Sequence, residues 1–429
     1  MKAYCIAALL LAATVLPAQA QTGQNQGKET LRFTLILSRH GIRPPLVSAA
    51  ALDRYSADPW PQWEVPLGYL TPHGGVALHQ MGAYMREEYA HEGLLTAKGC
   101  PASGAIYIYA DTDERNIMSS YTTFAGLEPG CAARAVNTIV PAAGVRDPLF
   151  TPVPGFFKAP SSAEIVADRA DVLGRDALNY FNATGNPELK EFAQVLAPDP
   201  AHPAAAPILA EARPLTTASG MVEDIFLEFL DGKPMSEVGW GRVDEAMMRR
   251  LMPLHTKQFT LSTRTPLAAR TNGSNMMAHI LETLEQAGRP DGQAVAGALG
   301  PVGTRMVYIS GHDSNLCNIG GLLGVHWTAE GLTDDTPPDS QIVFELWQNA
   351  KTKQYTVRLM YRAQTIDQLR SGERVTRAKP PIEVGLTPPG CSEGKACGFS
   401  DFDYAVRTRM NPAYVKAELL PTHVAAPVP

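Results

Sequence analysis

The sequence has 429 residues, of which 37 are basic and 43 acidic, so the formal net charge is −6 at pH 7. Hydrophobic residues make up 45% and charged residues 19%, a balance that excludes a disordered chain, because disorder requires fewer apolar and more charged residues. The acidic balance argues against nucleic acid or an anionic membrane as the main partner, since basic patches bind both. A chain of this length usually forms two domains.

The first twenty residues have the pattern of a secretory signal peptide. Lys2 precedes an apolar run over residues 7–16, and Ala18-Gln19-Ala20 forms a small-residue cleavage site. The run is too short to span a bilayer, and no later segment has the length and apolarity of a membrane anchor. We therefore expect residues 1–20 to be removed and the mature protein to be exported and soluble, either periplasmic or secreted.

Export permits disulfide bonds, and five cysteines remain after residue 20. Cys391 and Cys397 bracket a short hairpin, whereas Cys100 and Cys131 bracket one strand-and-helix unit. The sequence predicts these two bridges and leaves Cys317 free and buried. No CxxC motif or Cys/His cluster suggests zinc, so we expect no metal site.

The N-terminal third has the pattern of an α/β fold. Residues 31–37 form a mostly apolar run, which is typical of a strand buried on both faces of a sheet. Thr71 and Pro72 supply an N-cap and a first-turn proline for a helix over residues 74–91. A second strand is expected over residues 105–110, followed by another helix.

The middle of the chain is richer in helical patterns, which are separated by connections rich in Pro and Ala. These patterns cover residues 221–230, 243–254 and 275–287. A third strand is expected over residues 306–310, and the runs at residues 341–347 and 355–361 predict a hairpin.

The simplest architecture is an α/β sandwich with a central, mainly parallel sheet flanked by helices. Residues 28–153 and 290–425 would form this discontinuous α/β domain. A mainly helical domain over residues 154–289 would be inserted between its two halves.

Charged clusters directly follow three of the expected strands. The clusters comprise Arg39, His40 and Arg43, then Asp111 to Arg115, and then His312 with Asp313. Because the carboxyl ends of parallel strands meet at one edge of a sheet, these side chains are expected to line one cleft. Several guanidinium groups together favour a phosphate dianion, which arginine binds bidentately.

Two imidazoles and a carboxyl group among these arginines indicate catalysis as well as binding. A neutral imidazole is a competent nucleophile toward phosphorus, and a protonated carboxyl can donate to a leaving alkoxide. The guanidinium groups would stabilise the transferring phosphoryl group without a metal. Taken one at a time, these residues are better explained without a catalytic role, with Arg39 and Arg43 as surface charges and His40 as a loop residue. The whole set at three strand ends favours an active site.

The sequence resembles a known family at these same residues. The segment Arg39 to Pro45 matches the RHGxRxP signature of histidine acid phosphatases, and His312-Asp313 matches their distal His-Asp pair. The resemblance covers nearly all of the mature chain and is strongest to the bacterial periplasmic phytase and glucose-1-phosphatase branch. That branch also has disulfides at positions like the two predicted above. Further matching segments are residues 59–63, 70–75, 239–242 and 336–338.

The resemblance implies a two-step mechanism that requires no cofactor. His40 would attack phosphorus to form a phosphohistidine, Asp313 would protonate the leaving oxygen, and water would then release phosphate. An acid pH optimum would follow if Asp313 must start protonated, since a free Asp titrates at about pH 4. The phosphoryl oxygens would be held by Arg39, Arg43, Arg115 and His312.

The sequence mixes features of the two kinds of relative. Gly41 and the Asp111 to Arg115 segment resemble the phytases, whereas Leu46 and Ser314 resemble glucose-1-phosphatase. Leu46-Val47 replaces the Thr-Lys of bacterial phytases, in which the Lys helps to bind the charged inositol ring.

Three further residues belong to the implied substrate site. Met221 matches a pocket Met of the phytases, Asp224 stands where they have a Glu, and Asp111 opens the second charged cluster.

The sequence therefore predicts an exported acid phosphomonoesterase that hydrolyses small phosphorylated substrates, either sugar or inositol phosphates. A dedicated phytase is the alternative within the same chemistry. A non-catalytic phosphate-ester-binding protein is the alternative from another class, but a pure binder has no use for both His40 and Asp313. A phosphoglycerate-mutase-like transferase shares the Arg-His-Gly start, but we would not expect it to have the helical insert, the signal peptide or the His-Asp pair.

Overall fold

The computed structural model describes residues 29–416 apart from 133–134, 140–145, 154–155, 183–185, 200, 203–206 and 212, together with residues 423–425. The predicted signal peptide lies outside the described residues. The helices are α1 (Ala49–Leu52), α2 (Pro72–His91), α3 (Glu114–Leu127), α4 (Ser162–Asn182), α5 (Pro187–Leu196), α6 (Pro214–Leu230), α7 (Glu245–Phe259), α8 (Pro266–Gly288), α9 (Asp313–Leu323), α10 (Ile366–Ser371) and α11 (Phe399–Arg409). Short 3₁₀ or π segments are η1 (Asp53–Tyr55), η3 (Val238–Gly241), η4 (Thr260–Arg264) and η5 (Pro412–Tyr414). The strands are β1 (Glu29–Arg39), β2 (Ile106–Ala110), β3 (Asn137–Ile139), β4 (Met306–Gly311), β5 (Thr328–Ala329), β6 (Leu332–Thr333), β7 (Gln341–Asn349), β8 (Tyr355–Ala363), β9 (Ile382–Leu386), β10 (Cys397–Gly398) and β11 (His423–Ala425).

The main sheet has the strand order β10-β8-β7-β1-β4-β2-β3-β11, and β9 also pairs with β8. The pairs β1–β4, β4–β2 and β2–β3 are parallel, whereas the outer pairs are antiparallel. This confirms the predicted mainly parallel centre flanked by helices, and also the predicted β7–β8 hairpin.

Strand β1 is central because its side chains are apolar toward both faces of the sheet. Phe33, Leu35 and Leu37 belong to the core on one face, and Leu31 and Ile36 to the core on the other. A strand covered on both sides needs such a near-continuous apolar run.

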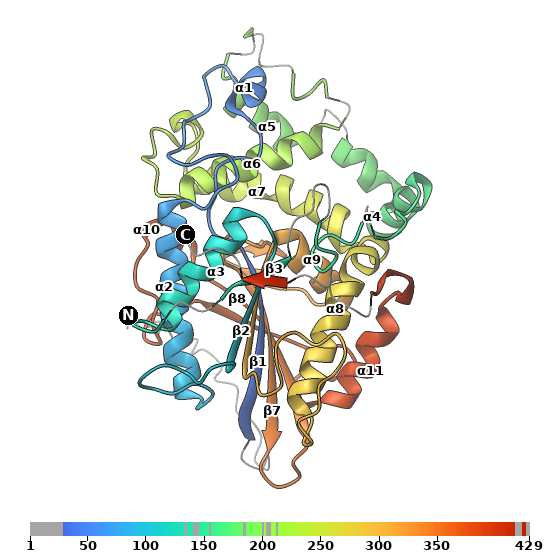
Figure 1. Cartoon of the computed structure of the whole chain (residues 1–429). Helices are drawn as coiled ribbons and strands as arrows, with labels where there is room; N and C mark the ends of the chain where they lie inside the picture. The colour runs from blue at the N-terminus through green and yellow to red at the C-terminus, as the bar shows by residue number, and fades with distance from the viewer. Residues whose placement is uncertain are drawn as a thin grey trace, which may run out of the picture.

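Helices cover both faces of the sheet (Figure 1). Helices α8, α9 and α11 pack on one face, and α2 and α3 pack on the other. Helices α2 and α3 pack so closely that their contact leaves no room for a side chain at two glycines. A Cβ atom on Gly82 would lie 2.0 Å from the Thr123 carbonyl oxygen, and a Cβ atom on Gly126 would lie equally close to the carbonyl oxygen of His79.

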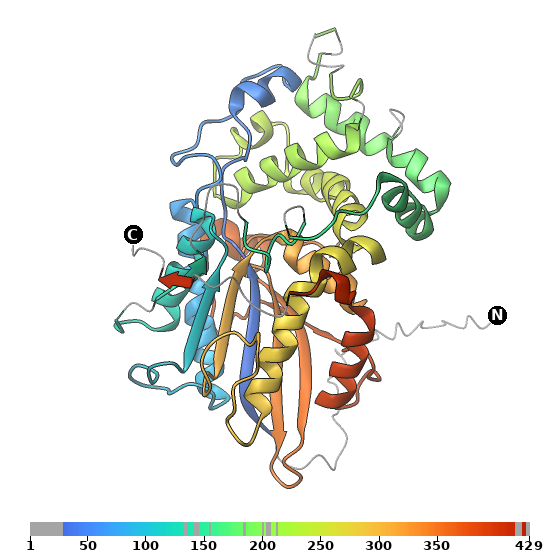
Figure 2. The same cartoon turned by 45° about the vertical axis from the view of Figure 1, so that its right-hand side comes forward.

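A separate apolar core joins α5, α6 and α7. These helices lie beyond the carboxyl ends of the parallel strands (Figure 2). The buried side of α8 packs with the sheet rather than with this helical core, and the boundaries of the inserted domain remain a prediction. No helix in the described part of the chain is long and apolar enough to cross a membrane.

The predicted cap and both predicted disulfides are confirmed. The Thr71 hydroxyl accepts a hydrogen bond from the Gly74 amide at 2.9 Å, which satisfies one of the free N–H groups at the start of α2. The bridges Cys100–Cys131 and Cys391–Cys397 are formed. Cys317 is free and buried.

Candidate active site

Three loops that follow parallel strands meet at one edge of the sheet. The register aligns Arg39 at the end of β1 with Gly311 at the end of β4, and Ser310 with Ala110 at the end of β2. The residues after these ends carry the three charged clusters found in the sequence. The topology therefore brings the clusters together, as the strand order requires.

His40 is buried beside β4, and a hydrogen bond to the neighbouring backbone orients its ring. Its Nδ1 lies 2.8 Å from the carbonyl oxygen of Gly41. Because a carbonyl can only accept, Nδ1 carries the proton and the lone pair is on Nε2. The ring lies edge-on to that of His312, with 5.6 Å between the centroids.

The surroundings of His40 favour its neutral form. Burial removes the ring from water, and Arg39 and Arg115 place positive charge nearby, so the pKa of His40 lies well below its ordinary value. A buried imidazole with a free Nε2 lone pair is the arrangement required of a nitrogen nucleophile.

Arg39, Arg43 and Arg115 line the same site. Each is paired with a carboxylate: Arg39 Nη2 lies 2.9 Å from Asp313 Oδ2, and Arg115 Nη2 lies 2.8 Å from Asp113 Oδ2. The Nε–H group of each arginine is buried and has no hydrogen-bond partner in the described part of the chain. Three guanidinium groups at one edge of the sheet suit an oxygen-rich anion.

Glu223 connects two of these arginines, and the sequence analysis missed it. It reaches from α6 to the sheet edge, where Oε1 accepts from Arg39 and Oε2 lies 3.1 Å from Arg43 Nη2. Burial alone would raise the pKa of this carboxyl, but the charges of Arg43 and Arg39 outweigh burial and hold the pKa well below its usual range. The sequence does contain a signal for Glu223, because Glu223-Asp224 interrupts an apolar helical pattern. Carboxylates that are buried in this way need cationic partners.

Asp224 and Met221 lie on the same helix. Asp224 Oδ1 is 3.9 Å from Arg43 Nη1, and burial raises the pKa of Asp224 to about 7, with Arg43 opposing the rise and Glu223 adding to it. Met221 is buried in the core of the helical layer. The structure thus places Asp224 beside an arginine of the site, and the substrate-binding roles of both residues remain predictions.

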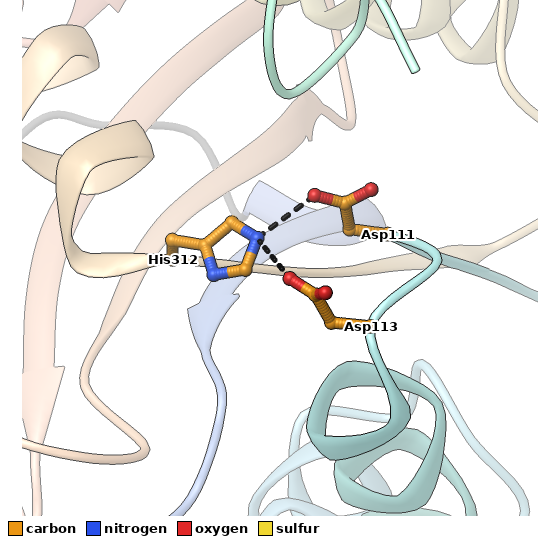
Figure 3. A group of neighbouring side chains, drawn as sticks. All are labelled: Asp111, Asp113 and His312. Atoms are coloured by element: carbon orange, nitrogen blue, oxygen red, sulfur yellow. Dashed lines mark hydrogen bonds and ion pairs between the residues drawn. The ribbon is translucent and has the colours of Figure 1, made fainter. Parts of the chain in front are cut away.

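His312 lies between two carboxylates (Figure 3). Its Nε2 is 2.8 Å from Asp111 Oδ2 and 3.6 Å from Asp113 Oδ2. A carboxylate only accepts here, so Nε2 carries a proton and Nδ1 faces Arg115 Nη2 at 3.5 Å. The interaction with Asp111 therefore fixes the orientation of the ring.

Asp111, Asp113 and His312 are also the one group in the described part of the chain whose ligand atoms, all within 4.8 Å of one another, could share a metal ion. Each carboxylate already pairs with a positively charged or N–H-donating side chain, Asp111 with His312 and Asp113 with Arg115. Both carboxylates are therefore already engaged by side chains of the protein.

Asp313 is the first residue of α9. Its Oδ1 accepts from the Ser314 amide at 2.6 Å, while Oδ2 pairs with Arg39. These contacts hold the carboxyl group at the sheet edge that also carries His40. A carboxyl group and an imidazole therefore lie at the same edge, among three guanidinium groups.

The chain belongs to the histidine phosphatase superfamily (branch 2), because the model of that family matches residues 30–362. This confirms the predicted family and, at that level, a phosphoric monoester hydrolase.

Among curated relatives, the chain is 32% identical to phytase AppA of Escherichia coli (strain K12), over 96% of this chain and 99% of the relative. It is 27% identical to the glucose-1-phosphatase of Providencia rettgeri, over 93% of this chain and 96% of the relative. Among solved structures, Hafnia alvei phytase in complex with myo-inositol hexakis sulphate is similar with a TM-score of 0.79 and 30% identity, covering 90% of this chain and 99% of that chain.

Proposed function

We propose that this chain is an exported acid phosphomonoesterase that hydrolyses sugar or inositol phosphates through a phosphohistidine at His40. The observation that carries the proposal is His40 itself, a buried neutral imidazole with a free Nε2 among three arginines. The similarity to a phytase and to a glucose-1-phosphatase supports the two substrate classes.

In the first step, the Nε2 lone pair of His40 attacks phosphorus and the bond from phosphorus to the ester oxygen breaks. Asp313, in its protonated form, gives its proton to that oxygen, so the alcohol leaves neutral. In the second step, water attacks the phosphohistidine and loses a proton to Asp313, which releases phosphate and restores His40. Atoms and protons balance over these two steps without a cofactor.

The arginines stabilise the charge that spreads over the phosphoryl oxygens during transfer. The lowered pKa of His40 matters here, because the ring stays neutral and nucleophilic at acid pH. His312, oriented by Asp111, supplies a further polar contact at the same edge.

Export is supported by the leader-like residues 1–20 and by the two disulfide bonds, which persist in oxidising compartments. A dedicated phytase is the second candidate, and the similarity to the Hafnia alvei phytase in complex with a hexakis-sulphated inositol favours it. Val47 weighs against it, because no cation stands at that position.

The test is phosphate release at pH 5 in the presence of a metal chelator, with glucose 1-phosphate and phytate side by side at matched concentration. We expect release by the mature protein and a loss of at least about a thousandfold in the variant His40→Ala, as for removal of an essential nucleophile. His91→Ala, at an exposed position at the end of α2, is the matched control and should keep full activity. Unchanged turnover in His40→Ala would refute the mechanism.

A further inference from the structure

A pocket of about 210 Å³ lies in the helical part of the molecule, where α4 contacts α8 (Figure 2). None of the residues described above for the candidate active site lines this pocket, so it is a separate feature of the fold. Most of its wall is aliphatic, and it includes Val153, Pro160, Ile165, Leu261, Leu267 and Ala268.

Two threonine hydroxyl groups in this lining are buried and have no hydrogen-bond partner in the described part of the chain. They belong to Thr265, which is 1% exposed, and Thr271, which is 2% exposed. Thr265 stands at the N-cap position of α8, but its side chain accepts no hydrogen bond there. Two hydroxyl groups on one wall of the pocket are therefore available to a ligand.

Other hydroxyl groups on the same stretch of chain are satisfied by their own helix. Ser262 Oγ donates to the Gln258 carbonyl oxygen at 2.8 Å, and Ser274 Oγ donates to that of Arg270 at 2.6 Å. Such a bond to the preceding turn is common for Ser and Thr in a helix. The two pocket threonines lack it, and a buried hydroxyl without a partner costs free energy. A ligand that hydrogen-bonds to them would offset this cost.

The two charged residues of the lining, Asp168 and Arg169, have opposite signs and connect α4 to its neighbours. Asp168 Oδ1 accepts a hydrogen bond from the Leu267 amide at 2.9 Å, and Arg169 Nε donates to the Leu261 carbonyl oxygen at 3.0 Å. The pocket thus offers no excess charge of either sign, which favours an uncharged ligand.

We propose that this pocket binds small uncharged ring compounds that carry one hydroxyl group, the class of the phenols. An apolar cavity of about 150 Å³ is large enough to bind benzene, so the larger pocket has room for a ring with a small polar substituent. The ring would lie against the aliphatic wall, and its hydroxyl group would pair with Thr265 and Thr271. An apolar lining with a few polar groups is typical of small-molecule sites.

Three probes separate the contributions of apolarity and hydrogen bonding. Phenol and toluene have the same aromatic ring and the same number of non-hydrogen atoms, but only phenol has a hydroxyl group. Myo-inositol has a ring of similar size with a hydroxyl group on every carbon. The measured quantity is the Kd of each probe for the mature protein, from titrations followed by the ¹³C-methyl NMR signals of Val153, Ile165, Leu261 and Leu267.

For the wild-type chain we expect a Kd for phenol on the order of 0.1 to 1 mM, because so small a ligand makes few contacts. Toluene should bind about fivefold more weakly, because it leaves the threonine hydroxyl groups unpaired. Myo-inositol should not bind, because the aliphatic wall would leave most of its hydroxyl groups without partners.

The variant Thr271→Val removes one hydroxyl group and keeps the shape of the side chain. It should raise the Kd for phenol severalfold, to about the value for toluene, and should not weaken toluene. The matched control is Thr122→Val on α3, where the lost hydroxyl donates to the Met118 carbonyl oxygen of its own helix, and it should change neither Kd. Ala268→Leu, which fills the pocket, should abolish the binding of both probes.

A pocket that holds only water would show no change in the four methyl groups with phenol or toluene up to their solubility limits, and this result would overturn the proposal. Equal Kd values for phenol and toluene that Thr271→Val does not alter would also overturn it, because the hydroxyl groups would then have no part in recognition. The measurement needs no phosphate release, so failure of the proposed function would leave this test intact.

Discussion

At the scale of single residues, the site is a balance of buried charges. Three arginines lie at the sheet edge, and Glu223 is the carboxylate that two of them share. A buried ion network holds its geometry only while each partner is present, because removal of one leaves an uncompensated charge. Glu223 therefore positions Arg39 and Arg43, and in the proposed mechanism it would act on the reaction through them.

The variant Glu223→Gln should lower the free energy of unfolding by about 2 kcal/mol at pH 7, because the amide keeps a hydrogen bond but loses the charge. The folded-state pKa of Glu223 lies below its unfolded value, so its contribution is complete above about pH 4.3 and is lost as the pH falls further. The difference between wild type and variant, measured by urea unfolding, should be constant from pH 7 to 5 and shrink below. Glu393→Gln, on an exposed loop, should show no such difference. A stability difference between wild type and Glu223→Gln that grew at low pH would contradict the lowered pKa of Glu223.

The sequence could point to candidate site residues that share a motif or follow a strand. His40, Asp313 and the three arginines could be named because each lies just after an apolar run or at the start of the following helix. Glu223 could not, because its partners are about 180 residues away along the chain. Only the folding of α6 over the sheet edge shows which cations face this carboxylate.

At the scale of elements, the long buried strands and capped helices followed from periodicity and turn chemistry, as for β1 and α2. The pattern did not indicate β3, β9 or α11. Strands β3 and β9 are three and five residues long and lie toward the edges of the sheet, so their pairing depends on neighbours more than on local sequence. Helix packing also depends on small residues whose need for space is visible only in three dimensions.

Gly82 provides a test of this packing. Gly82→Ala would place a Cβ atom 2.0 Å from the Thr123 carbonyl oxygen and force α2 and α3 apart, which should cost at least about 2 kcal/mol of stability. Gly75→Ala is the control on the same helix, since its Cβ atom would meet only Thr122 Cγ2 at 3.7 Å. That variant should be neutral or stabilised by up to about 1 kcal/mol through helix propensity. Thermal unfolding of both variants measures these changes in stability. Equal changes in the two variants would show that the close approach of the helices is not the reason for glycine at position 82.

At the scale of the whole molecule, the chain holds the residues of the candidate site between a sheet layer and a helical layer. The layers have separate apolar cores, and the ion pairs of Glu223 join them. Sequence composition predicted the two regions, but not that α8 packs with the sheet, because a helical pattern does not indicate which core covers its apolar face.

The disulfides lie away from this junction. Cys100 precedes β2 and Cys131 follows α3, so their bridge lies toward the amino ends of the parallel strands, opposite the site. In the chain-entropy account, a bridge spanning 31 residues stabilises by about 4 kcal/mol and one spanning 6 residues by about 2 kcal/mol. The double variant Cys100→Ser/Cys131→Ser should therefore lose more stability in urea unfolding than Cys391→Ser/Cys397→Ser. Both should keep kcat at 25 °C, and a reversed order of stability would contradict this account.

The most direct test of the central claim is to trap the covalent intermediate. The mature protein is mixed with a ³²P-labelled sugar monophosphate at pH 5, quenched in alkali within milliseconds, digested and mapped. The account predicts label on the peptide that contains His40, acid-labile and alkali-stable as a phosphohistidine is, and absent from His40→Ala. Label on another residue, or rapid turnover with no label on His40, would contradict the mechanism.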